Sequence, residues 1–189
     1  MKNYIIVHGS FGSPFINWFK WFQNEVSKND NQVIIPQFPI GLDYQNYDNW
    51  KQLLDYYKDL NLINENTVFI GHSIGVIFII KYLIQNNFKA NKIILVSGFN
   101  NYNVDGNIYD QVNKSFFTKN ITKIKELVKE IICIYSDNDP YVKYDELKRF
   151  ADEISTKQSV IPQGGHLNSE SGYDSFEEIL TFIDESYHI

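Results

Sequence analysis

Short apolar runs alternate with longer stretches of helical periodicity along the chain, and this alternation restricts the fold more than any other feature. The runs are rich in β-branched residues, and several are continuously apolar, as strands buried on both faces of a sheet are. The predicted strands are residues 4–7, 33–35, 67–70, 92–96, 131–135 and 159–161. Because helical stretches separate successive strands, the chain is expected to belong to the α/β class.

The stretches between the runs carry apolar residues at helical spacing. The apolar faces are Phe15, Phe19, Phe22 and Val26; Trp50, Leu53, Leu54 and Tyr57; Ile121, Ile124 and Val128; Leu147, Phe150 and Ile154; and Phe176, Ile179, Leu180 and Ile183. A length of 189 residues without a Pro-, Gly- or Ser-rich linker predicts a single domain, residues 1–189. We therefore predict a mostly parallel, six-stranded sheet with helices on both faces.

Composition excludes several classes of partner. The formal net charge is −6, and the sequence has no run of like charges; this argues against nucleic acid as a partner, since phosphate binding calls for a basic patch. The longest apolar stretch, residues 76–80, is far shorter than the roughly 20 residues of a membrane span, and the apolar run at residues 4–7 is too short for a signal peptide. Cys133 is the only cysteine, so no internal disulfide can form. We expect a soluble cytoplasmic protein with no membrane or nucleic-acid partner.

The third predicted strand is followed by Gly71-His72-Ser73-Ile74-Gly75 and then by an apolar helical stretch. This is the G-x-S-x-G pattern of a nucleophile elbow, in which a strand turns into a helix within one residue. Side chains two residues before and after the serine would collide, which explains the glycines. The elbow holds the hydroxyl of Ser73 above the sheet edge, at a helix N-terminus that favours a developing oxyanion.

A serine nucleophile requires a base, and His166 is the candidate that follows a predicted strand in the expected chain order of Ser, Asp and His. Gly164 and Gly165 would let its loop fold back over the sheet edge. The chain has three other histidines, His8, His72 and His188. His72 lies inside the elbow and His188 is expected to fray near the C-terminus, while His8 follows the first strand and belongs to a different motif.

The orienting carboxylate should follow the fifth strand, where Asp137 and Asp139 are both candidates. We favour Asp139, because Pro140 holds it in an extended conformation that suits a carboxylate reaching out of a loop. Asp137 is the alternative, otherwise a turn-forming residue.

The first predicted strand ends at His8-Gly9-Ser10-Phe11-Gly12. In a fold of this type a backbone N–H from this loop and the N–H after the nucleophile form the oxyanion hole. The predicted donors are the N–H groups of Ser10 (or Phe11) and Ile74. Aromatic residues near the predicted site suggest an apolar acyl pocket, although for any single one core or lid packing is the favoured explanation; these are Phe11, Phe99, Phe116, Phe117 and Tyr141.

With these residues in hand, the chain resembles the compact serine hydrolases of the retinoblastoma-binding-protein-nine type, a branch of the α/β-hydrolase superfamily. The resemblance runs nearly end to end and is carried by Trp18-Phe19-Lys20-Trp21, Trp50, Gly71-His72-Ser73, Val96-Ser97, Ser136-Asp137-Asn138-Asp139-Pro140 and Gly165-His166. It implies a shortened sheet without a large lid, and it assigns the catalytic carboxylate to the aspartate directly before the proline, Asp139. The chain lacks the L-x-C-x-E pattern associated with retinoblastoma binding, because the residues that flank its only cysteine, Cys133, do not match that pattern. Cys133 is also expected to lie within a buried strand.

These observations predict a serine hydrolase that is carboxylesterase-like, uses a Ser73-His166-Asp139 triad and forms an acyl-enzyme intermediate. Its partner would be a small-molecule acyl substrate, and an ester, a thioester or an amide would each serve. No metal or organic cofactor is expected. The alternative is a non-catalytic protein-binding module that keeps the α/β-hydrolase scaffold.

Overall fold

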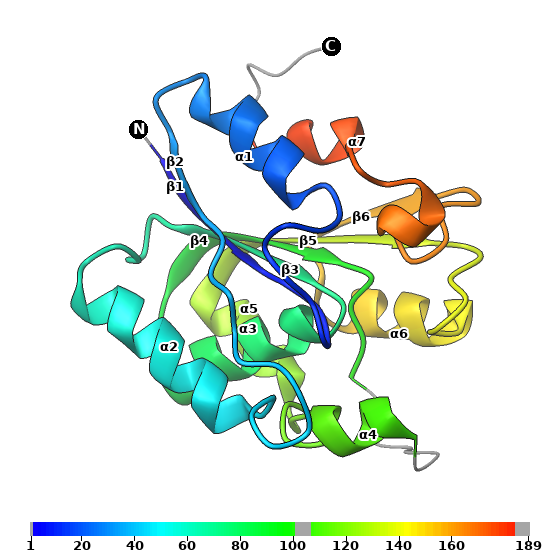
Figure 1. Cartoon of the computed structure of the whole chain (residues 1–189), viewed down its shortest axis with the longest axis horizontal. Coiled ribbons are helices and arrows are strands. Elements are labelled where there is room, and N and C mark those ends of the chain that lie inside the picture. The colour runs from blue at the N-terminus through cyan, green and yellow to red at the C-terminus, as the bar shows by residue number, and fades with distance from the viewer. Residues whose placement is uncertain (1, 101–106, 184–189) are drawn as a thin grey trace.

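The computed structural model describes residues 2–100 and 107–183, and within them the chain forms one α/β domain built on a central sheet (Figure 1). The strands are β1 (Asn3–Val7), β2 (Gln32–Ile34), β3 (Val68–His72), β4 (Ala90–Val96), β5 (Val128–Ser136) and β6 (Lys157–Ile161). Their order in the described part of the chain is β2-β1-β3-β4-β5-β6, and every pair is parallel. The predicted six-stranded sheet is confirmed, and it is wholly rather than mostly parallel.

Helices cover both faces of this sheet. They are α1 (Phe19–Ser27), α2 (Tyr47–Asp59), α3 (Ile74–Gln85), α4 (Ile108–Asn113), α5 (Ile124–Leu127), α6 (Tyr144–Ile154) and α7 (Glu177–Leu180), with short 3-10 turns η1 (Ile121–Lys123) and η2 (Ser169–Ser171). In Figure 1, α1 and α7 lie on one face, and α2, α3, α5 and α6 lie on the other. None of the helices in the described residues is long and apolar enough to cross a membrane.

Two hydrophobic clusters fill the space between the sheet and its helices. The cluster under α1 and α7 includes Trp18, Phe22 and Phe176, and the other includes Trp50 and most of α3. Helix α3 is buried along nearly its whole length, which fits its almost continuously apolar sequence. Full burial of an Ile or Phe side chain contributes about 1.5–3 kcal/mol, so these two layers supply the main stabilising term.

Two details of the predicted helices were wrong. Phe15 does not share the buried face of the first helix, because α1 begins at Phe19 and the Phe15 side chain is exposed. The stretch from Ile121 forms η1 and the one-turn α5, and Val128 already opens β5. Both segments contain turns with a left-handed residue, Asn17 and Asn120, which helical periodicity alone cannot reveal.

The carboxyl ends of the strands meet at one edge of the sheet. The register pairs Val7 with Gly71, His72 with Val96, and Ser136 with Ile161. All parallel strands point the same way, so the segments that follow β1, β3, β4, β5 and β6 emerge together. This edge therefore gathers the predicted site residues from four separate parts of the chain, the segments after β1, β3, β5 and β6.

Candidate active site

Ser73 occupies a sharp turn between β3 and α3. Its backbone angles are φ 57° and ψ −126°, a conformation that residues other than glycine seldom adopt. The Ser73 N–H donates to the carbonyl oxygen of Val96 at 2.9 Å, which ties the turn to the end of β4. A strained residue of this kind persists only where its surroundings hold it, and such residues cluster at functional sites.

Gly71 and Gly75, which flank this turn in the sequence, leave no room for a side chain. A Cβ added to Gly71 would come within 2.8 Å of Val76 Cα, and one added to Gly75 would come within 2.4 Å of the Val7 carbonyl oxygen. Both contacts are with backbone atoms, so they could not be relieved by rotating a side chain. The collision expected from the sequence is therefore present at both glycines.

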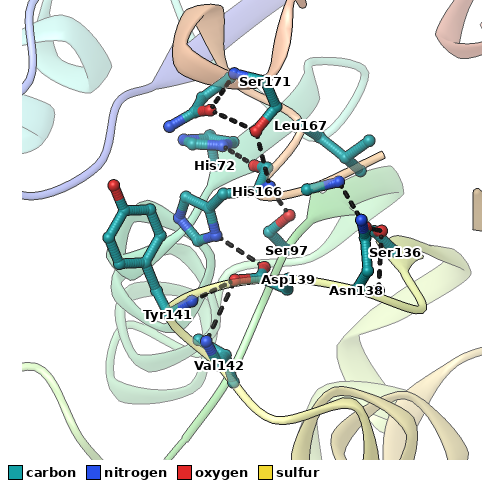
Figure 2. Close-up of polar contacts among 12 residues, drawn as sticks. His72, Ser97, Ser136, Asn138, Asp139, Tyr141, Val142, His166, Leu167 and Ser171 are labelled. Carbon is teal, nitrogen blue, oxygen red and sulfur yellow. Dashed lines mark hydrogen bonds and ion pairs between the residues drawn. The ribbon is translucent and has the colours of Figure 1, made fainter. Parts of the chain in front are cut away.

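The side chains of His166 and Asp139 face each other at the same edge (Figure 2). His166 Nδ1 lies 2.7 Å from Asp139 Oδ2, and the side chains are 8% and 0% exposed. The other carboxylate oxygen, Oδ1, accepts the N–H groups of Tyr141 at 2.8 Å and Val142 at 3.1 Å. Since an ionised carboxylate only accepts hydrogen bonds, this arrangement puts a proton on Nδ1 of His166 and leaves its Nε2 free to accept one.

Asp137 has a different position. Its Oδ1 accepts the backbone N–H of Gln163 at 2.8 Å, in the loop that leads to His166. The neighbouring Asn138 accepts the N–H of Gly165 at 2.7 Å through its Oδ1. Of the two candidate carboxylates, Asp139 contacts the histidine and Asp137 contacts the backbone of its loop.

Ser73 is near this pair but is not hydrogen-bonded to it. Within residues 2–100 and 107–183 the Ser73 hydroxyl makes no hydrogen bond, whereas the ring of the preceding residue, His72, lies 5.0 Å from the ring of His166. Catalytic hydrogen bonds are often long in enzymes without substrate and tighten on binding. The structure thus joins two of the predicted residues directly and brings the third to the same edge.

The loop that carries His166, residues 162–167, will be called the base loop. The His166 N–H donates to Ser171 Oγ at 3.1 Å. The His166 carbonyl oxygen accepts two hydrogen bonds, from His72 Nε2 at 2.9 Å and from Ser97 Oγ at 3.1 Å (Figure 2). Sequence reasoning did not foresee these contacts, although His72 and Ser97 follow or end strands and could have been candidates on that ground.

The loop after β1, residues 8–12, will be called the first loop, and it approaches Ser73 closely. A Cβ added to Gly9 would lie 3.1 Å from Ser73 Cβ and 3.6 Å from its Oγ. The N–H of Phe11 donates to Gln45 Oε1 at 2.8 Å, so it is already occupied. In the described part of the chain, the N–H groups of Ser10 and Ile74 make no hydrogen bond. Of the two predicted alternatives in this loop, Ser10 therefore has the available donor.

Buried amide side chains hold the first loop in place. Asn113 Oδ1 accepts the hydroxyl of Ser10 at 2.6 Å and the Nε2 of Gln45 at 3.1 Å. Gln45 is 2% exposed and Asn113 is 6% exposed, which is unusual for side chains of this kind. Neither residue was singled out from the sequence, because nothing in their local surroundings marks them as buried.

His8 is also part of this support rather than a second base. Its Nε2 accepts the N–H of Phe38 at 3.0 Å, and its Nδ1 lies 2.8 Å from the carbonyl oxygen of Gly9. Burial lowers the pKa of His8, so the ring is favoured in its neutral form. His188, the remaining alternative, lies outside the described residues.

The aromatic side chains named from the sequence divide into two groups: Phe99, Phe116 and Phe117 pack into or against the hydrophobic core, whereas Phe11 and Tyr141 contact other side chains nearer the surface. The Phe116 side chain is fully buried against Trp50, so it contributes to core packing rather than to an acyl pocket. Phe11 lies edge-to-face with the exposed Tyr109, at 5.6 Å between ring centroids, and the exposed Tyr141 lies edge-to-face with His166 at 5.0 Å. The Tyr141 hydroxyl donates to Glu170, and this hydrogen bond raises the pKa of Tyr141 to about 12.

A family profile described as serine hydrolase matches residues 4–185 of the chain. The fold, the elbow and the match over nearly the full length agree. The chain belongs to the serine hydrolase family, in its retinoblastoma-binding-protein-nine and YdeN type.

Individual relatives support the same assignment. The chain is 28% identical to the Bacillus subtilis (strain 168) protein YdeN over 176 residues, which cover 92% of this chain and 90% of that one. The crystal structure of the B. subtilis ydeN product superposes with a TM-score of 0.84 and covers 99% of this chain and 98% of that one, at 27% identity. Est1E from Butyrivibrio proteoclasticus, solved with ferulic acid bound, gives a TM-score of 0.69 at 16% identity and covers 96% of this chain and 86% of that one. This last likeness concerns the fold alone.

Proposed function

We propose that this protein hydrolyses a small acyl ester, thioester or amide through an acyl-enzyme intermediate on Ser73, with His166 as the general base and Asp139 as its orienting carboxylate. The observation that carries the proposal is the 2.7 Å contact between His166 Nδ1 and the buried carboxylate of Asp139, at the edge where Ser73 is held at positive φ. A neutral histidine whose Nδ1–H is fixed by a carboxylate offers its Nε2 to a hydroxyl.

In the first half of the reaction, His166 Nε2 takes the proton of the Ser73 hydroxyl while Oγ bonds to the carbonyl carbon of the substrate. The tetrahedral intermediate collapses, and the leaving alkoxide, thiolate or amine takes that proton from His166. In the second half, His166 deprotonates a water that attacks the acyl-serine. Collapse then releases the carboxylic acid and returns the proton to Ser73.

The proposed oxyanion hole consists of the backbone N–H groups of Ser10 and Ile74. Ile74 is the first residue of α3, so its N–H lacks an intrahelical acceptor and lies at the positive end of the helix dipole. The closeness of Gly9 to Ser73 brings the first loop beside the nucleophile. Removing one donor from such a site typically lowers kcat by about 10²–10³.

A neutral, apolar acyl group fits the surroundings of the site best. Phe11, Tyr109 and Tyr141 supply aromatic surface, and the nearby Glu170 and the net charge of −6 disfavour an anionic substrate. Est1E, the structural relative crystallised with ferulic acid, is a reason to include a feruloyl ester among the substrates tested. A panel of p-nitrophenyl esters, thioesters and anilides of increasing acyl length would define the class of bond and the acyl preference.

The deciding experiment is labelling with a fluorophosphonate probe, combined with hydrolysis of an activated ester. The wild-type protein should react at Ser73, and Ser73→Ala should take no label and lose hydrolysis, while its thermal transition stays close to that of the wild type. Removing a hydroxyl at this position opens no core cavity, so a large loss of stability has no cause here.

Ser155→Ala is the matched control, because its hydroxyl donates to the Ala151 carbonyl oxygen at the end of α6. This variant should label and turn over like the wild type. Absence of labelling in the wild-type protein would favour the non-catalytic binding module. Retention of more than about a hundredth of wild-type turnover in Ser73→Ala would remove Ser73 as the nucleophile.

A further inference from the structure

His72 is a buried, polar residue to which the proposed mechanism gives no part. It ends β3 directly before Ser73 and is 3% exposed. Its ring packs edge-to-face against Trp18 at 6.5 Å and Phe19 at 6.1 Å, on one side of the sheet, and against His166 at 5.0 Å. An apolar ring would suit the two aromatic neighbours equally well, so packing alone does not account for a histidine.

The two ring nitrogens of His72 have different surroundings. Nε2 lies 2.9 Å from the carbonyl oxygen of His166, which can only accept, so Nε2 carries the proton (Figure 2). Nδ1 is then an acceptor, and it is buried without a hydrogen-bond partner among the described residues. A buried acceptor without a partner costs stability, and the residue therefore carries a cost that an apolar side chain would avoid.

We propose that His72 is a positioning residue for the general base: it holds the His166 backbone at a fixed distance from Ser73 through the Nε2–H donation to the His166 carbonyl. This rests on the proposed function, because it assigns the hydrogen bond a part in the reaction of Ser73 and His166.

The position of His72 in the chain makes this link a short one. Residues 72 and 73 are joined by one peptide bond, so the donor and the nucleophile are parts of the same rigid turn. The acceptor belongs to the same residue as the proposed base. One hydrogen bond thus connects the elbow to the base loop, and a shift of the loop away from Ser73 would have to break it.

Ser97 supports the same carbonyl from the other side. Its Oγ donates to the His166 oxygen at 3.1 Å, and it follows β4 rather than belonging to the elbow. The Ser97 bond fixes the loop relative to the end of β4, which is joined to Ser73 by the hydrogen bond from the Ser73 N–H to Val96. The His72 bond fixes the loop directly to the residue bonded to the nucleophile. The two donors are therefore not equivalent.

The charge state of His72 suits this role. Burial, followed by the nearby charge of His166, lowers the pKa of His72 to about 3, although the His166 carbonyl and the charge of Asp139 oppose that shift. His8 is the remaining titratable group that faces it, and its effect also favours the neutral ring. A donor that stays neutral remains in place while His166 gains and loses a proton during each turnover.

One test uses the unmodified protein. In ¹⁵N-histidine-labelled wild type, two-bond nitrogen–proton couplings distinguish the two neutral tautomers. His72 should be the Nε2–H tautomer with a slowly exchanging proton and should not titrate between about pH 5 and pH 8, the range in which an ordinary histidine changes charge. An Nδ1–H tautomer, or titration within that range, would overturn the proposal whether or not the variants below fold.

The second test compares His72→Gln with His72→Met. The two replacements have similar length and flexibility, and only glutamine can donate from the ε position. We expect His72→Met to lower kcat about tenfold with KM unchanged, and His72→Gln to stay within about threefold of the wild type. Circular dichroism melting of both variants would establish that they are folded.

The outcomes separate this proposal from the proposed function. A folded His72→Met variant with wild-type kcat, or a folded His72→Gln variant that loses as much kcat as His72→Met, would refute the positioning role alone. A wild-type protein that hydrolyses no acyl substrate and takes no fluorophosphonate would refute both.

Discussion

The base loop and the first loop lie at the same edge of the sheet beside Ser73, but they are held by different parts of the chain. The base loop is fixed mainly by residues that end or follow strands, together with Ser171 of η2; the strand-end residues are His72, Ser97, Asp137 and Asn138. The first loop is fixed by the side chains of Gln45 and Asn113, which lie just before α2 and at the end of α4.

This difference separates two kinds of preorganisation. Strand ends are set by the sheet, whose backbone hydrogen bonds leave little freedom, so the proposed base is built into the rigid part of the fold. The proposed Ser10 donor of the oxyanion hole instead depends on two buried carboxamides outside the sheet, Gln45 in the segment before α2 and Asn113 at the end of the short helix α4. Such segments move more readily than the strands of a sheet. We therefore expect substitutions at the base loop to act mainly by changing the tautomer or protonation of His166. Substitutions at the supports of the first loop should act mainly by displacing its backbone N–H from Ser73.

The largest effect should come from Asp139→Asn. An amide in this position keeps the shape of the side chain but can donate toward His166, which favours the wrong histidine tautomer. In a triad this lowers kcat by roughly 10³–10⁴. The measurement is steady-state hydrolysis of the best ester in the panel, with the KM compared between variant and wild type.

Asp137→Asn is the matched control, because Asp137 lies in the same segment between β5 and α6. It retains an oxygen for the Gln163 N–H, so it should lower kcat less than about tenfold. If the effects of the two substitutions were reversed, Asp137 would be the catalytic carboxylate and the assignment of Asp139 as the partner of His166 would be wrong.

A smaller effect is expected from Gln45→Met in the first loop. Methionine fills a similar volume but leaves the Phe11 N–H without its acceptor and removes the donation from Gln45 to Asn113, whose Oδ1 then accepts only the Ser10 hydroxyl. The first loop thus loses one direct contact, and its Asn113 support loses a second. We expect kcat/KM to fall about tenfold, with the fluorophosphonate labelling rate falling in parallel.

Gln158→Met provides a comparison of the same chemical change elsewhere. Gln158 is an exposed residue of β6 that bonds Tyr135 and Asp152, far along the chain from the first loop. This variant should keep wild-type kcat/KM. Equal rates in Gln45→Met and the wild type would mean that the first loop holds its shape without the Gln45 carboxamide.

The same contrast explains which features could be predicted from the sequence. Strand identity followed from β-branched runs, and the order of the chain then placed Ser73, Asp139 and His166 after three strands of one parallel sheet. The elbow glycines carried their own steric reason, which Gly71 and Gly75 bear out. These features depend on local periodicity and on topology, both of which a sequence displays.

The buried supports could not be predicted in this way. Gln45 is brought to the Phe11 N–H across 34 residues of chain, and Asn113 is brought to Ser10 across 103. Neither contact leaves a periodic or compositional trace, because it is formed by loop packing. His72 was placed correctly inside the elbow, but its donation to His166 depends on a register that spans 94 residues.

The smallest expected effect concerns the stability of the protein at low pH, and it depends on His72, the residue that ends β3. Burial lowers the pKa of His72 to about 3, whereas an unfolded histidine has a pKa of about 6.5. The unfolded chain therefore binds a proton at this residue as the pH falls below about 6.5, and the folded protein does not until about pH 3. The stability associated with neutral His72 is thus complete above about pH 6.5 and is lost progressively below it.

His72→Gln removes this titrating group and keeps a donor, so its melting temperature should fall less than that of the wild type between about pH 7 and pH 4, by roughly ten degrees. The comparison is made within each variant, because the substitution also changes stability at neutral pH. Ser155→Ala keeps every histidine and should follow the wild-type pH dependence. Equal falls in wild type and His72→Gln would mean that His72 gains its proton in the folded protein as readily as in the unfolded chain. That result would contradict its burial as a neutral donor, and it would leave the acid sensitivity to the carboxylates and to His8, whose pKa burial also lowers.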